Sequence, residues 1–170
     1  QLAKAVNFGL IYGAGAETLR DYAKSNYDID LTLKDAEHFR RKFFKLYRGL
    51  SRWHDRVNSR QEYVTHTLGG RYRKFNRKYK YKLTDRLNSP VQGTGADILK
   101  KALVLLRPQI KCLAKLVHIV HDEIILETPA ERAEEVKKIL EETMIEAGQY
   151  YIKMVPVEVE GNICDSWAEK

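Results

Sequence analysis

The sequence has few of the features that mark secreted or membrane proteins. Its two cysteines, Cys112 and Cys164, are too few for a disulfide scaffold, and their separation matches no metal-ligand spacing. It contains no run of about 18 apolar residues, and the first residues lack the basic and apolar regions of a signal peptide. These absences predict a cytoplasmic protein with no membrane partner.

The chain also lacks a starting methionine. Gln1 is the first residue, and residues 2–12 already have the pattern of a helix interior. A folded domain rarely begins inside a helix. We therefore expect this chain to be one piece of a longer protein: a cut fragment, a processed product or one part of a split protein.

The chain does contain an ordinary share of hydrophobic residues and an excess of positive charge. Hydrophobic residues make up 44% of its 170 residues, enough for one domain with a core. Lys and Arg total 30 against 23 Asp and Glu, which gives a net charge of +7. This excess fits a nucleic-acid partner, although many basic proteins bind none.

Apolar spacing and helix breakers predict a helix-rich chain. Thr32 followed by Asp35 is the pattern of an N-terminal capping box, and Gly49 is expected to interrupt the helix that Thr32 begins. Residues 88–90 predict a break before a further helix. The predicted helices cover residues 2–12, 16–24, 32–57, 92–106 and 130–147.

Two hairpins and a last strand are predicted between and after these helices. Gly69-Gly70 is expected to form the turn of a hairpin over residues 63–75. Asp122 and Glu123 are expected to form a tight two-residue turn in a hairpin over residues 116–127. Residues 155–160 alternate as a final strand. Helices with antiparallel strands predict an α+β fold.

The opening helix carries three side chains that match the parts of a nucleoside triphosphate. Lys4, Phe8 and Tyr12 are spaced by four residues, so they share one face in a column about 12 Å long. An ammonium group suits a polyphosphate, and aromatic rings suit a sugar and a base. The same spacing is also typical of a lysine that extends past two core aromatics, so spacing alone leaves both interpretations open.

Residues 4–13 resemble the fingers-helix signature of the DNA polymerase I family, also called family A. In that family a Lys, an aromatic residue and a Tyr-Gly pair fall at these intervals. The resemblance implies that Lys4 is a catalytic residue that contacts the triphosphate and that Phe8 stacks near the incoming sugar. It implies that Tyr12 lies where the template base and the nucleotide must fit. The family's arginine one turn before the lysine would precede Gln1.

The tight hairpin is a candidate metal site. A hairpin tip raises the Asp122 and Glu123 carboxylates clear of the sheet, and carboxylates suit Mg²⁺. An ordinary polar turn is the alternative, since Asp is a common turn residue. Residues 120–123 resemble the family's palm motif. The resemblance implies that Asp122 is a catalytic metal ligand, that His121 lies near the primer terminus, and that Glu123 is an auxiliary catalytic carboxylate.

Two further segments are candidate DNA contacts. Asn88 and Gln92 could read minor-groove acceptors, because amides both donate and accept, or they could cap a helix and pack in the core. Residues 88–97 resemble the family's minor-groove-tracking motif. One departure is that Thr84 stands where the family has an arginine, and Arg86 lies in another register, so that role is not transferred.

The second candidate DNA contact is a basic tract over residues 71–82, with seven basic residues and no acidic one. It is either a solvated loop or a surface for the phosphates of a primer–template duplex. Arg71, Arg73 and Lys74 are the predicted DNA-binding residues within it. Residues 161–167 resemble the family's carboxy-terminal strand, so the resemblance extends nearly from Gln1 to the end of the chain.

The resemblance implies template-directed DNA synthesis, in which a dNTP is joined to a primer 3′-hydroxyl with two Mg²⁺ ions. One aspartate cannot hold both ions, and the family's other palm motif lies upstream of the fingers helix. We expect this chain to be inactive alone and to act with the upstream part of the polymerase on primer–template DNA. Asp97, which the resemblance places on a packed helix, is not expected to be the second ligand.

The resemblance also implies which segments of the chain belong to the fingers and the palm, and in which kind of cell the protein acts. Residues 1–64 would form fingers helices, with a nucleotide-binding helix over 1–13. Residues 65–170 would form part of the palm, with a DNA-contacting segment over 71–97 and the metal-binding hairpin over 116–127. The expected setting is the cytoplasm of a bacterium or of a virus-infected host of bacterial type.

Three other functions remain open at this point. A phage-type RNA polymerase fragment shares a similar Lys-to-Tyr-Gly helix, but Phe8 after Asn7 and the segment from Asn88 to Gln92 favour DNA synthesis. A non-catalytic basic module would bind nucleic acid without metal or nucleotide. A metal-dependent nuclease is poorly supported by one Asp-Glu pair.

Overall fold

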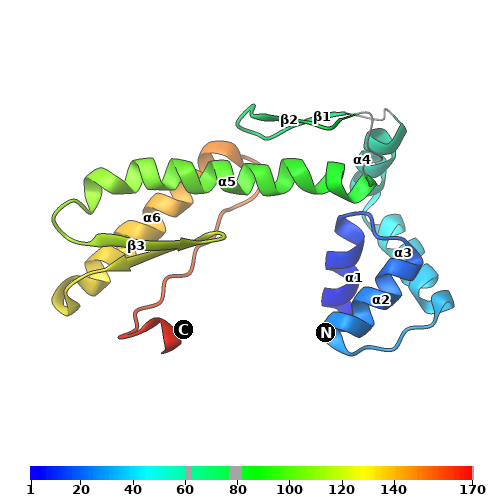
Figure 1. Cartoon of the computed structure of the whole chain (residues 1–170), viewed down its shortest axis with the longest axis horizontal. Coiled ribbons are helices and arrows are strands. Elements are labelled where there is room, and N and C mark those ends of the chain that lie inside the picture. Colours follow the sequence, from blue (N-terminus) through cyan, green and yellow to red (C-terminus); the bar gives the residue numbers. More distant parts are fainter. Residues whose placement is uncertain (60–62, 77–81, 170) are drawn as a thin grey trace. The chain divides into compact units, whose positions relative to one another are not determined.

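The structure, a computed structural model, describes residues 1–59, 63–76 and 82–169. Its contacts divide the chain into two compact units. The first unit contains Gln1–His66 and Tyr72–Val91, and the second contains Thr67–Arg71 and Gln92–Lys170. Helices dominate, and two small antiparallel sheets accompany them (Figure 1). The predicted α+β class is confirmed.

Four helices build most of the first unit. They are α1 (Leu2–Ile11), α2 (Ala16–Tyr27), α3 (Leu33–Leu46) and α4 (Arg48–Ser59). The centre of the unit is a cluster of buried side chains from the first three helices, namely Leu10, Leu19, Ala36 and Phe43. These helices match the predicted ones within a turn, because their apolar stripes face this common core.

The start of α3 shows the predicted capping box. The Thr32 hydroxyl accepts a hydrogen bond from the Asp35 amide at 3.1 Å, and the Asp35 carboxylate accepts one from the Thr32 amide at 3.3 Å. The interruption expected at Gly49 lies two residues earlier. Tyr47 ends α3 with a non-helical backbone and its carbonyl accepts the first hydrogen bond of the next helix, so Gly49 lies inside α4.

The first predicted hairpin is confirmed. Strands β1 (Val64–His66) and β2 (Tyr72–Lys74) are antiparallel, with His66 opposite Tyr72. Gly70 in the connecting turn has φ +82°, a left-handed conformation that glycine adopts without strain. The glycine pair therefore forms the turn, as the sequence predicts.

The predicted break at residues 88–90 is wrong. Helix α5 runs unbroken over Leu83–Gln109 (Figure 1). Pro90 removes one backbone N–H, which usually disturbs a helix. Leu87 and Thr94, on either side of it, are both buried. Tertiary packing on both flanks thus outweighs the local breaker signal.

The second unit is built on the later half of α5. Strands β3 (Lys115–Val120) and β4 (Glu123–Glu127) pair antiparallel. After a short 3₁₀ turn at Ala130–Arg132, helix α6 (Ala133–Tyr151) packs with β4 against α5 (Figure 1). The buried centre of this unit consists of Ala102, Leu106, Ile110, Ile124 and Ala147. None of the helices described in either unit is long and apolar enough to cross a membrane.

The predicted strand over residues 155–160 is wrong. These residues pair with no strand in the described structure and instead follow α6. Val157 packs so closely on Gly148 that a β-carbon there would lie 2.7 Å from it, and the Gly161 amide donates to the Glu141 carboxylate at 2.8 Å. Val157 and Gly161 thus contact α6, while Val155 is exposed. A short 3₁₀ helix over Trp167–Glu169 follows.

Candidate nucleotide-binding and metal-binding sites

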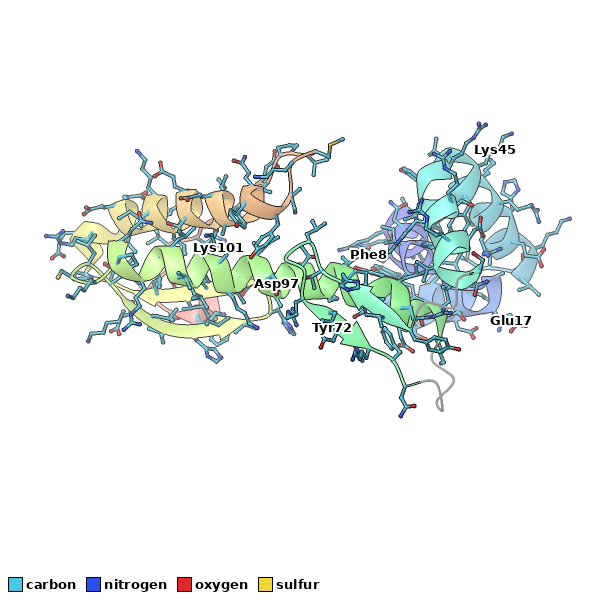
Figure 2. The ribbon with its side chains drawn as sticks, turned by 90° about the horizontal axis from the view of Figure 1, so that it is seen from above. Phe8, Glu17, Lys45, Tyr72, Asp97 and Lys101 are labelled. Carbon is cyan, nitrogen blue, oxygen red and sulfur yellow. The ribbon has the colours of Figure 1, made fainter. Side chains whose placement is uncertain are left out.

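The face of α1 that bears the predicted nucleotide-binding residues is open to solvent. Lys4 is exposed, the Phe8 side chain is 49% exposed, and Tyr12 is half-buried (Figure 2 marks Phe8 on α1). Leu10, on the opposite side of the helix, and Ala5, at the flank of the exposed face, are fully buried. The helix therefore buries its small and aliphatic face. The alternative in which Phe8 is a core aromatic does not hold.

The end of this helix is closed by a glycine in left-handed conformation. Gly13 has φ +82°, its amide donates to the Leu10 carbonyl at 3.0 Å, and the Ala14 amide donates to the Gly9 carbonyl at 3.1 Å. This is the six-residue pattern that ends many helices at a glycine. This helix end fixes the backbone conformation of Gly13, the residue immediately after Tyr12.

We expect Gly13→Ala to destabilise the chain by about 1–3 kcal/mol. The new β-carbon would be strained at this φ and would lie 2.9 Å from Leu87. Urea denaturation of the 170-residue protein measures the change. Gly15→Ala is the matched control, because a β-carbon at Gly15 meets nothing within 4 Å. Equal stability of the two variants would contradict the assigned role of Gly13.

The second hairpin has a different turn register from the predicted one. Val120 pairs with Glu123, so the two turn residues are His121 and Asp122, and Glu123 begins β4. His121 has φ +53°, a conformation that His adopts more readily than most residues. Glu123 pairs with Val120 at the start of β4. The expectation that Glu123 lies at the tip is wrong.

The tip still presents carboxylate oxygens to solvent. His121 and Asp122 are exposed and Glu123 is half-buried. Ile124, the next residue of β4, is 8% exposed and belongs to the core of the second unit, so it anchors the turn. Among the residues that the structure describes, no three His, Cys, Asp or Glu side chains are grouped to hold a metal ion. Because its carboxylate is exposed at the turn, Asp122 could supply one oxygen ligand of the kind that Mg²⁺ prefers, and further ligands would have to come from elsewhere.

Asp97 is held in an ion pair inside the second unit. Its side chain is 10% exposed, and its Oδ1 accepts a hydrogen bond from Arg71 Nε at 2.8 Å (Figure 2 marks Asp97 on α5). Burial alone would raise the pKa of the Asp97 carboxyl, but the Thr67 hydroxyl and the Arg71 guanidinium hold this pKa below its ordinary value. The expectation that Asp97 lies on a packed helix is confirmed.

Arg71 therefore has a structural contact that the sequence did not predict. Its Nη2 donates to the Gly93 carbonyl at 2.9 Å in addition to the bond with Asp97. About half of the Arg71 side chain remains exposed, at 51%. Two of its five N–H donors are used within the protein, and the rest of the guanidinium is accessible.

The depressed pKa of Asp97 predicts a pH-dependent contribution to stability. A carboxyl whose pKa is lower in the folded state stabilises the protein above its unfolded pKa and loses this effect as pH falls through its folded pKa. We expect Asp97→Asn to cost roughly 1–3 kcal/mol near pH 7 and progressively less toward pH 3. Urea denaturation across this range measures it, and the exposed Asp122→Asn is the control. A cost independent of pH would contradict the ion pair.

Neither amide caps a helix or packs in the core, the two structural roles that the sequence left open for them. Asn88 and Gln92 lie one turn apart on α5 and both are exposed, as is Ala96 one turn further. Asn88 lies inside the helix and therefore does not cap it, and Gln92 does not pack in the core. The two amides occupy an exposed stretch of one helical face, which a nucleic acid can reach.

The described part of the basic tract is also on the surface. Tyr72, Arg73 and Lys74 form β2 and are all exposed (Figure 2 marks Tyr72). The Arg73 guanidinium lies 5.0 Å from the centre of the Phe75 ring, and the Lys74 ammonium lies 5.4 Å from that of Tyr72. Residues 77–81 of the predicted tract lie outside the described residues.

The described elements are helices, one of which has an exposed cation–aromatic face, and two small antiparallel hairpins. This set of elements matches part of a solved polymerase domain. The sequence model for DNA polymerase family A matches residues 1–169. The chain belongs to this family.

Relatives and a solved structure agree with this assignment. The chain is 46% identical to DNA polymerase I of Aquifex aeolicus, covering 99% of this chain and 30% of that protein. It is 36% identical to the thermostable DNA polymerase I of Thermus filiformis, covering 98% and 20%. The polymerase domain of Pol1 from M. smegmatis, solved in complex with DNA primer-template and dNTP, matches with a TM-score of 0.72 and 26% identity. That match covers 86% of this chain and 27% of the solved one. The chain thus spans less than a third of each of these proteins.

Proposed function

We propose that this chain is part of a template-directed DNA polymerase that transfers a nucleotide from a dNTP to a primer 3′-hydroxyl. The observation that carries the proposal is the exposed face of α1 in a chain that matches family A over residues 1–169. Such a face is free to bind a ligand, because the helix buries its opposite side against the core of the first unit.

Each residue of the α1 face has a proposed part in nucleotide binding. The Lys4 ammonium neutralises charge on the triphosphate, including the charge that develops on the pyrophosphate as it leaves when the 3′-oxygen of the primer attacks the α-phosphorus. Phe8 packs on the sugar of the incoming nucleotide. Tyr12, half-buried at the end of the helix, lies where the new base meets the template base.

The hairpin turn supplies the proposed metal ligand. Asp122 would hold Mg²⁺, Glu123 would be an auxiliary carboxylate, and His121 would lie near the primer terminus. When bound, Mg²⁺ would supply stabilisation of the charge that develops during the transfer. The remaining ligands come from the upstream part of the polymerase, which is the proposed protein partner of this chain.

The proposed DNA contacts divide into two kinds. Asn88 and Gln92 meet minor-groove acceptors that all base pairs share. Arg73 and Lys74, with the accessible part of Arg71, meet phosphates of the primer–template duplex. In this scheme residues 1–64 act as fingers and residues 65–170 as part of the palm. The matched polymerases are bacterial, and we propose that the protein acts in the cytoplasm in DNA replication or repair.

Primer extension tests the proposal. The chain together with its upstream part is expected to extend a primer with dNTPs and Mg²⁺, and the chain alone is expected to be inactive. Extension by the isolated chain would contradict the need for further ligands. Better incorporation of rNTPs than of dNTPs by the intact protein would favour an RNA polymerase. DNA binding with no extension at all would favour a non-catalytic module.

We expect Arg73→Gln with Lys74→Gln to weaken binding of duplex DNA by the 170-residue chain. Each lost phosphate contact should make the slope of log K against log salt less steep by about 0.9. Fluorescence anisotropy at several salt concentrations measures the slope. Lys138→Gln with Lys153→Gln removes the same charge from α6 and the segment after it, and should leave the slope unchanged. An equal change of slope in both double variants would contradict a phosphate contact at Arg73 and Lys74.

A further inference from the structure

The last turn of α1 leaves one backbone carbonyl that only a side chain satisfies. The closing pattern at Gly13 uses the carbonyls of residues 9 and 10. The Ile11 carbonyl lies 2.8 Å from His54 Nε2, a side chain 43 positions later in α4. A carbonyl can only accept, so Nε2 carries the proton and donates it to Ile11. The end of α1 is thus bonded to α4.

His54 is built into the interior of the first unit. It is 6% exposed, and its ring packs on the rings of Phe44 at 5.3 Å and Trp53 at 5.4 Å between centres. Burial lowers the pKa of His54, although its bond to the Ile11 carbonyl acts in the opposite direction. The neighbouring charges act in opposite directions, since Asp55 raises this pKa and Arg40 lowers it. The ring is therefore neutral at pH 7 and keeps a single N–H donor.

Tyr12 lies between two residues whose backbone is held in place, Ile11 and Gly13. On one side of it, the Ile11 carbonyl is held by His54. On the other side, Gly13 is fixed by its left-handed backbone, with a β-carbon position only 2.9 Å from Leu87 and 3.8 Å from the His54 ring. The backbone of Tyr12 is therefore constrained in both directions, and its side chain starts from a fixed position.

We propose that His54 is a positioning residue for nucleotide selection, acting through Tyr12 at the end of α1. The proposal rests on the proposed function, in which Tyr12 lies where the incoming base meets the template base. A fixed Tyr12 leaves room for a correct base pair and little for a mismatched one. Because His54 touches neither the triphosphate nor the metal ligands, it affects selection of the nucleotide more than the transfer step.

Kinetics of the intact polymerase test this role. We expect His54→Leu to lower the ratio of correct to mismatched incorporation efficiency roughly tenfold, because the freed helix end shifts Tyr12. The KM for the correct dNTP should rise and kcat should change little. His54→Gln should stay near the unmodified protein, because its amide N–H₂ can take the place of Nε2–H.

The outcomes separate this proposal from the proposed function. Unchanged discrimination in His54→Leu, or an equal loss in His54→Gln, would overturn the role of His54 while leaving the polymerase assignment intact. Absence of any incorporation by the unmodified intact protein would instead overturn the polymerase assignment. A general loss of folding would reduce the fraction of active enzyme without changing discrimination between nucleotides, and that result also counts against positioning.

A second measurement needs no substitution. Nitrogen-15 NMR of the 170-residue chain should show His54 as the Nε2–H tautomer at pH 7, with a pKa below the ordinary value of about 6.5. The Nδ1–H tautomer, or a protonated ring at pH 7, would overturn the proposal even if His54→Leu failed to fold.

Discussion

Asp122→Ala in the intact protein is expected to reduce the proposed primer-extension activity roughly a thousandfold or more, since the metal ion that Asp122 would hold supplies several kcal/mol of transition-state charge stabilisation. Asp122 is exposed at the turn of the β3–β4 hairpin, and the core anchors this turn through Ile124. Removal of the carboxylate should therefore affect catalysis and leave folding intact. Single-turnover extension with saturating Mg²⁺ measures the loss.

Two controls make this prediction specific. Thermal unfolding of the 170-residue chain should be the same with and without Asp122→Ala. Glu131→Ala, which removes another exposed carboxylate from the same unit, should extend primers at the unmodified rate. Retained extension by Asp122→Ala would remove this residue from the metal site.

Phe8→Tyr is expected to relax discrimination against dideoxynucleotides by up to about tenfold. A phenol at this exposed position of α1 could form a hydrogen bond near the sugar edge and compensate for a missing 3′-hydroxyl. A neutral hydrogen bond contributes roughly 0.5–1.5 kcal/mol, and the upper end of this range corresponds to about tenfold. Competition between ddNTP and dNTP in primer extension measures it.

The matched control changes the hydroxyl group of an aromatic side chain at another exposed position. Tyr150→Phe, on α6, changes one hydroxyl group on a side chain of similar exposure, 58% against 49% for Phe8. It should leave dideoxynucleotide selection as it is. If Phe8→Tyr also left selection unchanged, the proposed contact between α1 and the sugar would be wrong.

The features predicted correctly from the sequence depend on residues close together in the chain. The face of Lys4 and Phe8 follows from helical spacing, and the capping box at Thr32 needs only the residue three positions later. The glycine turn of the first hairpin is likewise local. Such signals act within one or two turns, so the sequence alone reveals them.

The wrong predictions have a common cause, which is that tertiary contacts replaced the local preference. The buried neighbours of Pro90 keep α5 helical through a sequence that usually ends a helix. The alternation over residues 155–160 fits packing on α6 as well as it fits a sheet. The turn of the β3–β4 hairpin lies one residue earlier than predicted, in a register that buries Ile124 in the core of the second unit.

The residues that sequence reasoning missed act over long separations. His54 bonds to a carbonyl 43 positions earlier, and the ion pair of Asp97 with Arg71 spans 26 positions. A histidine on the apolar side of α4 is the one local sign of the first contact. No local pattern distinguishes Asp97 as the partner of an arginine, so that contact required the structure.

The most direct test is a structure of the intact protein with Mg²⁺, a dNTP and a primer–template whose primer lacks its 3′-hydroxyl. We expect the Lys4 ammonium on the triphosphate, Phe8 on the sugar, and a metal ion beside the Asp122 carboxylate. A triphosphate bound away from α1, or an Asp122 carboxylate with no metal beside it, would contradict this assignment of the nucleotide and metal sites.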